Sequence, residues 1–175
     1  TLRLKPDTEN NYVDVPQWIV DQAGNVHVIA CTDDFHHWVE IHPLSGDPDT
    51  WGDQSNWSVV TTLTDHNGGA LIQGNSFVAL RNGSYYMAFD DMDDGVYFLR
   101  TSADLTSGWK EAVKLDIDSD VHRGDSENLI FLSDGTMRFY ISNGNLLKHV
   151  MWYVDSKDLG VTWTSPKTLR FTGFS

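Results

Sequence analysis

Asp, Asn, Glu and His side chains gather in a few short segments of this chain, most of them next to an apolar run. Carboxylates and amides hydrogen-bond hydroxyl groups, and aromatic faces stack on C–H groups, so these residue types suit a sugar-binding pocket. If the fold brings the segments together, we expect a carbohydrate ligand. The segments are Asp14, Asp33 to His37, Asn75, Asp90 to Gly95, Asp125 to Asn128 and Asn143 to Asn145.

The same residues fit a metal or cofactor site poorly. With Gly95 at the sixth position of a calcium loop, Met92 would fill the third position and Thr101 the twelfth, where Glu is required. His36-His37 has no partner at metal-ligand spacing, and the chain has no Gly-rich phosphate loop and no Gly-x-Ser-x-Gly elbow. We predict a solvated loop at 90–95, no metal ligand and no cofactor.

Three copies of one unit supply the strands that must position these residues. Each copy has an apolar run, a tight turn and a second apolar run. Asn-Gly or Asp-Gly between short β-branched or aromatic runs is the strongest local hairpin signal, because glycine accepts the positive φ that the turn requires. The run, turn and run are 17–20, 21–25 and 26–29; then 77–80, 81–84 and 85–89; then 129–132, 133–136 and 137–141.

Each copy then closes with a Ser, an Asp two residues later and a Trp after a short gap. These triplets are Ser45, Asp47 and Trp51; Ser102, Asp104 and Trp109; and Ser156, Asp158 and Trp163. A period of about 50–60 residues with four short strands per unit is typical of propeller blades. We predict an all-β fold, a β-propeller of four-stranded antiparallel blades. The blades are expected at 12–66, 67–118 and 119–172 of a single domain, 1–175.

Three blades leave an open wedge with unpaired edges and exposed apolar residues, including Trp18, Ile19 and Ile130. Thr1-Leu2-Arg3-Leu4 resembles Thr168-Leu169-Arg170-Phe171, which ends the third blade, so 1–6 is expected to be the outer strand of a missing or partner blade. We expect the chain to be half of a six-bladed ring, closed as a homodimer, or to associate with the rest of a longer, five-bladed propeller.

Up-and-down blade topology sorts the connections onto two ends of each blade. The turns with Gly24, Gly83 and Gly135 fall at one end, together with the three Ser-x-Asp turns. The blade-to-blade connections fall at the other end, where the polar segments gather. The predicted substrate-binding residues are Trp18, His36, Asn75, Asp90, Asp91, His122 and Arg123.

Charge and composition argue against several partners. The chain has 12 Lys+Arg against 25 Asp+Glu and a formal charge of −13. Nucleic acid and anionic membranes both call for basic residues, and no apolar stretch approaches the ~20 residues of a membrane helix. We therefore expect neither partner. The lone Cys31 excludes an internal disulfide, and two sequons, at Asn56 and Asn82, are compatible with a secreted, extracellular protein.

The third closing turn, Ser156-Lys157-Asp158-Leu159-Gly160-Val161-Thr162-Trp163, resembles the Asp box of sialidase-like propellers. That resemblance implies a folding device, in which the Asp and Ser side chains bond turn backbone and the Trp packs between strands. Asp158 is accordingly expected to be structural and not catalytic.

The starts of the blades resemble the arabinanase-like superfamily, especially glycoside hydrolase family 43. The resemblance implies a five-bladed propeller that hydrolyses arabinose- or xylose-containing glycans with inversion, with Asp14 as general base and Glu127 as general acid. Inversion requires the two carboxyl groups to lie about 6.5–9.5 Å apart. The matching phrases are Asp14-Val15-Pro16, Arg81-Asn82-Gly83-Ser84-Tyr85-Tyr86, Thr101-Ser102-Ala103-Asp104-Leu105, His122-Arg123-Gly124 and Glu127-Asn128-Leu129.

Two departures from that family leave a second function open. Asn75 stands where the family has an Asp that tunes the acid, and two of the five blades are missing. The alternative is a lectin-like, non-catalytic propeller that binds carbohydrate without turnover. A structural propeller without a ligand is the third possibility.

Overall fold

The computed structural model describes residues 13–32, 37–71, 76–91, 96–110, 113–115, 127–142 and 151–169. These residues form strands, turns and two single-turn 3-10 helices, η1 (Pro48–Thr50) and η2 (Gln54–Asn56), and they contain no α-helix. Within the same residues, no helix has the length and apolar character needed to cross a bilayer. The all-β prediction is thereby confirmed.

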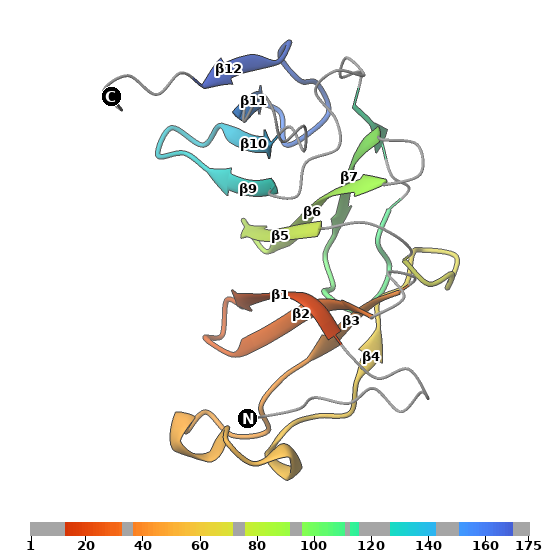
Figure 1. Ribbon diagram of the computed structural model, residues 1–175, viewed down its shortest axis with the longest axis vertical. Helices are drawn as coiled ribbons and strands as arrows, with labels where there is room; N and C mark the ends of the chain where they lie inside the picture. Colours follow the sequence, from red (N-terminus) through yellow and green to blue (C-terminus); the bar gives the residue numbers. More distant parts are fainter. Residues whose placement is uncertain are drawn as a thin grey trace. The chain divides into compact units, whose positions relative to one another are not determined.

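In the part of the chain that the structure describes, twelve strands form three four-stranded sheets, each with its strands in chain order (Figure 1). The first sheet contains β1 (Val13–Val20), β2 (Val26–Thr32), β3 (Trp38–Ile41) and β4 (Thr61–Thr62). The second contains β5 (Ser76–Arg81), β6 (Ser84–Asp91), β7 (Val96–Ser102) and β8 (Val113–Lys114). The third contains β9 (Glu127–Phe131), β10 (Met137–Ser142), β11 (Met151–Ser156) and β12 (Lys167–Leu169).

Backbone contacts divide the chain into two compact units. One comprises Thr1–Gly74, Leu80–Tyr86 and Thr101–Glu111, and includes the first sheet. The other comprises Asn75–Ala79, Met87–Arg100 and Ala112–Ser175, and includes the third sheet. The blade boundaries 12–66, 67–118 and 119–172 stay predictions, and the strand expected at 1–6 lies outside the described residues.

The predicted hairpins form around their turn residues. Asn82 and Gly83 have φ values of 51° and 76° and connect β5 to β6. Two successive positive φ values match the twist of a tight hairpin, and Asn and Gly accept them at the lowest steric cost. The same sequence signal therefore sets the turn and the pairing that follows it.

Alternation along β1 decides which of its side chains are buried. Ile19 is 6% exposed, whereas its neighbours Trp18 and Val20 are 58% and 53% exposed, because successive side chains of a strand point to opposite faces. The expectation that Ile19 is exposed was wrong for this reason. Near the start of β1 the pairing register shifts between Asp14 and Gln17, a bulge that includes Pro16, which has no N–H to give to the ladder.

The first sheet has two chemically different faces. On one face Val28 and Ile41 pair across β2 and β3 and pack with Trp57, which lies in the β3–β4 connection. On the other face Ile29 pairs with Glu40. Glu40 is 1% exposed, so this face of the sheet buries a carboxylate.

The third sheet buries every second residue of β10. Met137, Phe139 and Ile141 are fully buried. Arg138 lies on the opposite face, where its Nε and Nη2 donate to the two carboxylate oxygens of Asp155 at 2.6 and 2.9 Å. Its guanidinium carbon lies 4.1 Å from the centre of the Tyr153 ring. The cation is therefore already partnered on its own sheet.

All three Ser-x-Asp turns use the same hydrogen bonds. The Ser Oγ accepts from the backbone N–H of the Asp two residues later, at 3.1, 3.0 and 3.4 Å in chain order. The Asp carboxylate accepts further backbone N–H groups of its turn, and the Trp Nε1 donates to a carbonyl of the same turn. These side chains close the turns of the fold, as their repetition in the sequence predicted.

Candidate functional site

The two predicted catalytic carboxylates occupy matching places in their own sheets. Asp14 is the second residue of β1 and pairs with Cys31, and Glu127 is the first residue of β9 and pairs with Ile141. Each therefore stands at the start of the first strand of a four-stranded sheet. Asp14 belongs to one compact unit and Glu127 to the other.

Of the predicted substrate-binding residues, Asp90 and Asp91 are the last two residues of β6. His36, Asn75, His122 and Arg123 lie outside the described residues. Trp18 is the one whose side chain is described, and it belongs to an aromatic cluster.

Trp18, Trp51 and Trp57 form this cluster on the face of the first sheet that carries Val28. The Trp18 and Trp51 rings lie 6.2 Å apart at an interplanar angle of 16°, and the Trp18 and Trp57 rings 6.1 Å apart at 64°. Trp18 remains more than half exposed, so it offers a flat apolar surface supported from below. Such a surface suits contact with the C–H face of a sugar ring.

The connection between β3 and β4 holds the other two tryptophans in place. Trp51 Nε1 donates to the Ser45 carbonyl and Trp57 Nε1 to the Trp51 carbonyl, each at 2.9 Å. Asp47 and Asp53 cap the two 3-10 helices by accepting backbone N–H groups. The aromatic cluster is thus built on hydrogen-bonded turns and a strand, and its geometry is preorganised.

On the opposite face of the first sheet, two histidines meet a buried carboxylate. His27 Nδ1 and His42 Nδ1 lie 2.7 and 3.0 Å from the same atom, Glu40 Oε1. The arrangement follows from the ladder, because Glu40 pairs with Ile29, and His27 and His42 are each two residues further along on the same face. Among the described residues, His27, Glu40 and His42 form the group that can offer three ligand atoms to a metal ion.

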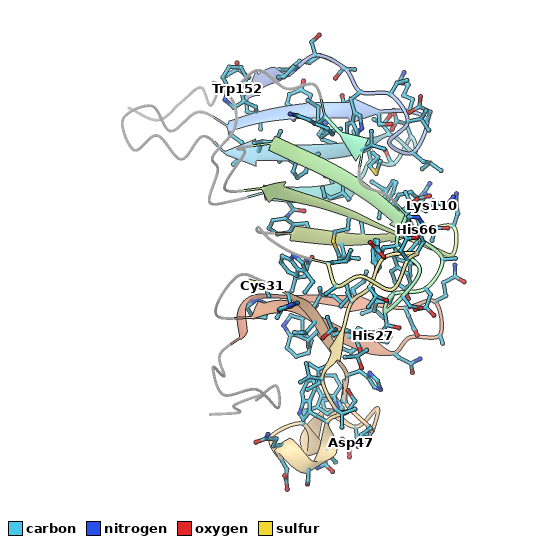
Figure 2. All side chains as sticks on the ribbon, turned by 90° about the vertical axis from the view of Figure 1, so that its right-hand side faces the viewer. His27, Cys31, Asp47, His66, Lys110 and Trp152 are labelled. Carbon is cyan, nitrogen blue, oxygen red and sulfur yellow. The ribbon has the colours of Figure 1, made fainter. Side chains whose placement is uncertain are left out.

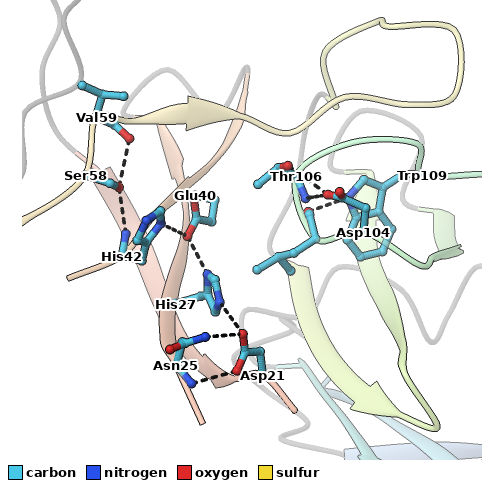
Figure 3. A network of polar contacts seen from close by, with 11 residues as sticks. Asp21, Asn25, His27, Glu40, His42, Ser58, Val59, Asp104, Thr106 and Trp109 are labelled. Carbon is cyan, nitrogen blue, oxygen red and sulfur yellow. Dashed lines mark hydrogen bonds and ion pairs between the residues drawn. The ribbon is translucent and has the colours of Figure 1, made fainter. Parts of the chain in front are cut away.

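A second carboxylate stands behind this cluster. Asp21 Oδ2 lies 3.5 Å from His27 Nε2, and Asp21 also accepts from the backbone and side-chain nitrogens of Asn25, each at 2.8 Å (Figure 3). These hydrogen bonds, led by the one from the Asn25 side chain, lower the pKa of Asp21 to about 2. The carboxylate is therefore charged at neutral pH.

Carboxylates of the cluster and of the second closing turn also act on Tyr85. The pKa of Tyr85 is raised, first by burial and then by the charges of Asp21, Asp104 and Glu40.

Figure 2 shows His27 on the first sheet, apart from Asp47 in the β3–β4 connection. His42 is the member of the cluster most open to solvent, with its side chain 43% exposed.

Sequence reasoning did not find this cluster. The sequence drew attention to the adjacent histidines His36 and His37. The contact between His27 and Glu40 instead joins two residues that are 13 positions apart, on paired strands. One signal was present: Glu40 interrupts the apolar run Trp38-Val39-Glu40-Ile41, and a charge inside a buried strand calls for a partner.

The third sheet has a hollow of about 510 Å³ at the end formed by its turns, lined by residues including Leu132, Thr136 and Trp163. The paired Arg138 and Asp155 also line it. Asp134, Lys157 and Lys167 line it as well, so charged groups of both signs face this hollow.

In sequence, no protein-family profile and no curated protein matches the chain. In structure, it is similar to a protein of unknown function from Dyadobacter fermentans, at 14% identity and a TM-score of 0.67 over 96% of this chain and 54% of that one. An α-L-arabinofuranosidase from Podospora anserina, solved with cellotriose, is 12% identical with a TM-score of 0.61. The match covers 88% of this chain and 49% of that one. A GH43 enzyme from Xanthomonas citri is 13% identical with a TM-score of 0.55, and the match covers 94% of this chain and 57% of that one.

These similarities extend the description of the fold. The three sheets are antiparallel four-stranded blades of a β-propeller like those of GH43 enzymes, which confirms the predicted fold class. The chain spans about half the length of these solved proteins.

Proposed function

We propose that the chain is a glycan-acting propeller that hydrolyses arabinose- or xylose-containing glycosides with inversion. The observation that supports this proposal is the matching placement of Asp14 and Glu127, each at the start of the first strand of its sheet. The fold in which they occur is shared with solved structures described as an arabinofuranosidase and a GH43 enzyme. The proposal includes an extracellular location, where such glycans are accessible.

In this mechanism Glu127 is the general acid and Asp14 the general base. The protonated Glu127 carboxyl group gives its proton to the leaving oxygen while the Asp14 carboxylate removes a proton from the attacking water. No cofactor takes part in these steps. His36, Asn75, Asp90, Asp91, His122 and Arg123 are proposed to hydrogen-bond the sugar hydroxyl groups.

A lectin-like function is the second candidate, and the aromatic cluster favours it. Trp18 presents an exposed ring stacked on Trp51, which is a binding feature that needs no catalytic group. Asn75 in place of a carboxylate also removes a charge that would tune an acid. In this reading the chain binds carbohydrate without turning it over.

Changing the two carboxylates tests the enzymatic proposal. We expect Asp14→Asn and Glu127→Gln each to lower turnover of chromogenic arabinofuranosides or xylosides by about 10²–10⁴-fold, the usual contribution of positioned acid and base groups. Circular dichroism should show an unchanged fold. The matched control is Asp49→Asn, which removes an exposed carboxylate from the β3–β4 connection and should leave turnover unchanged.

A glycan array run beside the substrate panel separates the two candidates. Binding without turnover, lost in Trp18→Ala and retained in Glu127→Gln, would support the lectin. Turnover that survives both Asp14→Asn and Glu127→Gln would contradict the assignment of the catalytic pair.

We also propose that the 156–163 turn is a sialidase-type Asp box with a structural role. Its support is the hydrogen bonding of Ser156, Asp158 and Trp163, which is directed entirely into the turn.

A further inference from the structure

We propose that His27, Glu40 and His42 bind one divalent transition-metal ion, with Zn²⁺ as the preferred occupant. The site would lie on the face of the first sheet opposite the aromatic cluster, and it is independent of the glycosidase proposal. Two imidazole nitrogens and one carboxylate oxygen form a donor set typical of zinc sites that keep a fourth position for water.

The donor atoms of the three side chains converge on one point of the sheet face. The three residues offer ligand atoms that all lie within 4.8 Å of one another. Ligands of tetrahedral Zn²⁺ lie about 3.3–3.5 Å apart, since each is about 2.0–2.2 Å from the metal. The N···O distances of 2.7 and 3.0 Å are shorter than this spacing by about 0.3–0.8 Å. A small outward movement of the two rings would admit the ion.

The His27 ring has a carboxylate at each of its two nitrogen atoms. Its Nδ1 faces Glu40 and its Nε2 faces Asp21, so two carboxylates flank one ring. A neutral imidazole has a single N–H to donate. Nδ1 lies 2.7 Å from the Glu40 oxygen and Nε2 lies 3.5 Å from the Asp21 oxygen. A cation that replaces the proton between Nδ1 and Glu40 leaves the single N–H at Nε2, where Asp21 can accept it.

Neighbouring residues hold the two histidines in place. Histidines that bind metals usually donate their other ring N–H to a carboxylate or carbonyl, which fixes the ring orientation. Asp21 holds this place behind His27, and Asn25 in turn holds Asp21. On the other side, the backbone N–H of His42 donates to Ser58 Oγ at 3.1 Å (Figure 3), and the Ser58 N–H donates to the His42 carbonyl at 2.8 Å.

Burial and charge also select the kind of ion. Glu40 is almost fully buried, and burying a carboxylate is costly unless a cation or good hydrogen bonds compensate it. Ca²⁺ and Mg²⁺ prefer oxygen ligands, whereas imidazole suits Zn²⁺, Ni²⁺ and Cu²⁺. The two nitrogen donors therefore favour a transition metal. The half-exposed His42 leaves a path for the ion to enter from solvent.

Calorimetric titration of the metal-free full chain tests the proposal. We expect one Zn²⁺ per chain and no binding of Mg²⁺ at the same concentration. His42→Gln should abolish stoichiometric Zn²⁺ binding, and Asp21→Asn should weaken it by about 10–100-fold, the usual effect of removing a supporting carboxylate. Co²⁺ should give the intense visible absorption of a tetrahedral complex in the wild type and lose it in His42→Gln.

Two control variants make the outcome decisive. His66→Gln removes a histidine outside the cluster and should leave Zn²⁺ binding unchanged. A His36→Gln/His37→Gln double variant removes the adjacent pair. Loss of binding in this double variant with retention in His42→Gln would overturn the proposal, as would a wild-type chain that binds no Zn²⁺. Because the His42 side chain is 43% exposed, we expect His42→Gln to fold like the wild type, and circular dichroism checks this.

Discussion

Asp158 shows how much a single exposed carboxylate is shaped by its turn. The Thr162 hydroxyl donates to Asp158 Oδ2 and the Thr162 backbone N–H to Oδ1, at 2.5 and 2.9 Å. These bonds, followed by one from Ser156, lower the pKa of Asp158 from 3.8 to about 2. The charged form is thus the one that the folded turn stabilises.

This shift predicts a pH-dependent contribution to stability. Because the folded-state pKa is lowered, the stabilisation is fully present above pH 3.8 and is lost as the pH falls towards 2. We expect Asp158→Asn to lower the thermal midpoint at pH 7, and the difference from wild type to shrink between about pH 4 and pH 2. Thermal melts followed by circular dichroism at several pH values measure it. A difference that stays constant down to pH 2 would contradict this account.

At the scale of elements, backbone hydrogen bonds join the segment that follows β4 to the second closing turn. Residues 64–66 exchange backbone hydrogen bonds with Thr106 and Trp109, and Trp109 is fully buried with its Nε1 donating to the Leu105 carbonyl. This contact lies within one compact unit and connects segments about 40 residues apart in the chain.

Removing the Trp109 side chain should therefore destabilise the protein strongly. We expect Trp109→Ala to lower the free energy of unfolding by about 3–5 kcal/mol, because a large cavity forms and the indole hydrogen bond is lost. The control is Val59→Ala, whose side chain is 85% exposed and whose change should stay within about 0.5 kcal/mol. Urea denaturation measures both. Equal effects of the two variants would show that Trp109 does not hold the turn to the sheet.

The sequence predicted the elements well where a local signal sets them. Asn82-Gly83 and the Ser-x-Asp triplets act within a few residues, so the hairpins and closing turns were confirmed. The cluster of His27, Glu40 and His42 depends on the register of β2 against β3, which a single sequence does not reveal. Trp18 was selected as a sugar-contacting residue, but its partners Trp51 and Trp57 come from a connection that was read only as a closing turn.

At the scale of the whole molecule, exposed apolar side chains are the feature on which we base a prediction of association. The chain spans about half the length of the solved propellers it resembles, and Trp18, Val20 and Val113 leave apolar surface exposed. Exposed apolar surface of this kind commonly marks an interface, and symmetric dimers are the commonest oligomers.

We therefore expect the purified chain to associate. Light scattering should give a particle mass of about twice the 19.8 kDa of one chain. Replacing the exposed Trp18 with Gln should weaken association if this surface is part of the interface. A stable particle of 19.8 kDa with no bound partner would refute the expectation.

The buried Cys31 is a chemical probe for the opening of the first sheet. It is the single cysteine of the chain, 1% exposed on β2, and it pairs with Asp14 on one side and Trp38 on the other. A thiol reagent can react with it only when these strands separate, so the labelling rate follows the opening of this one sheet. The labelling rate of Cys31 thus reports on the opening of β1, the strand that carries the proposed general base Asp14.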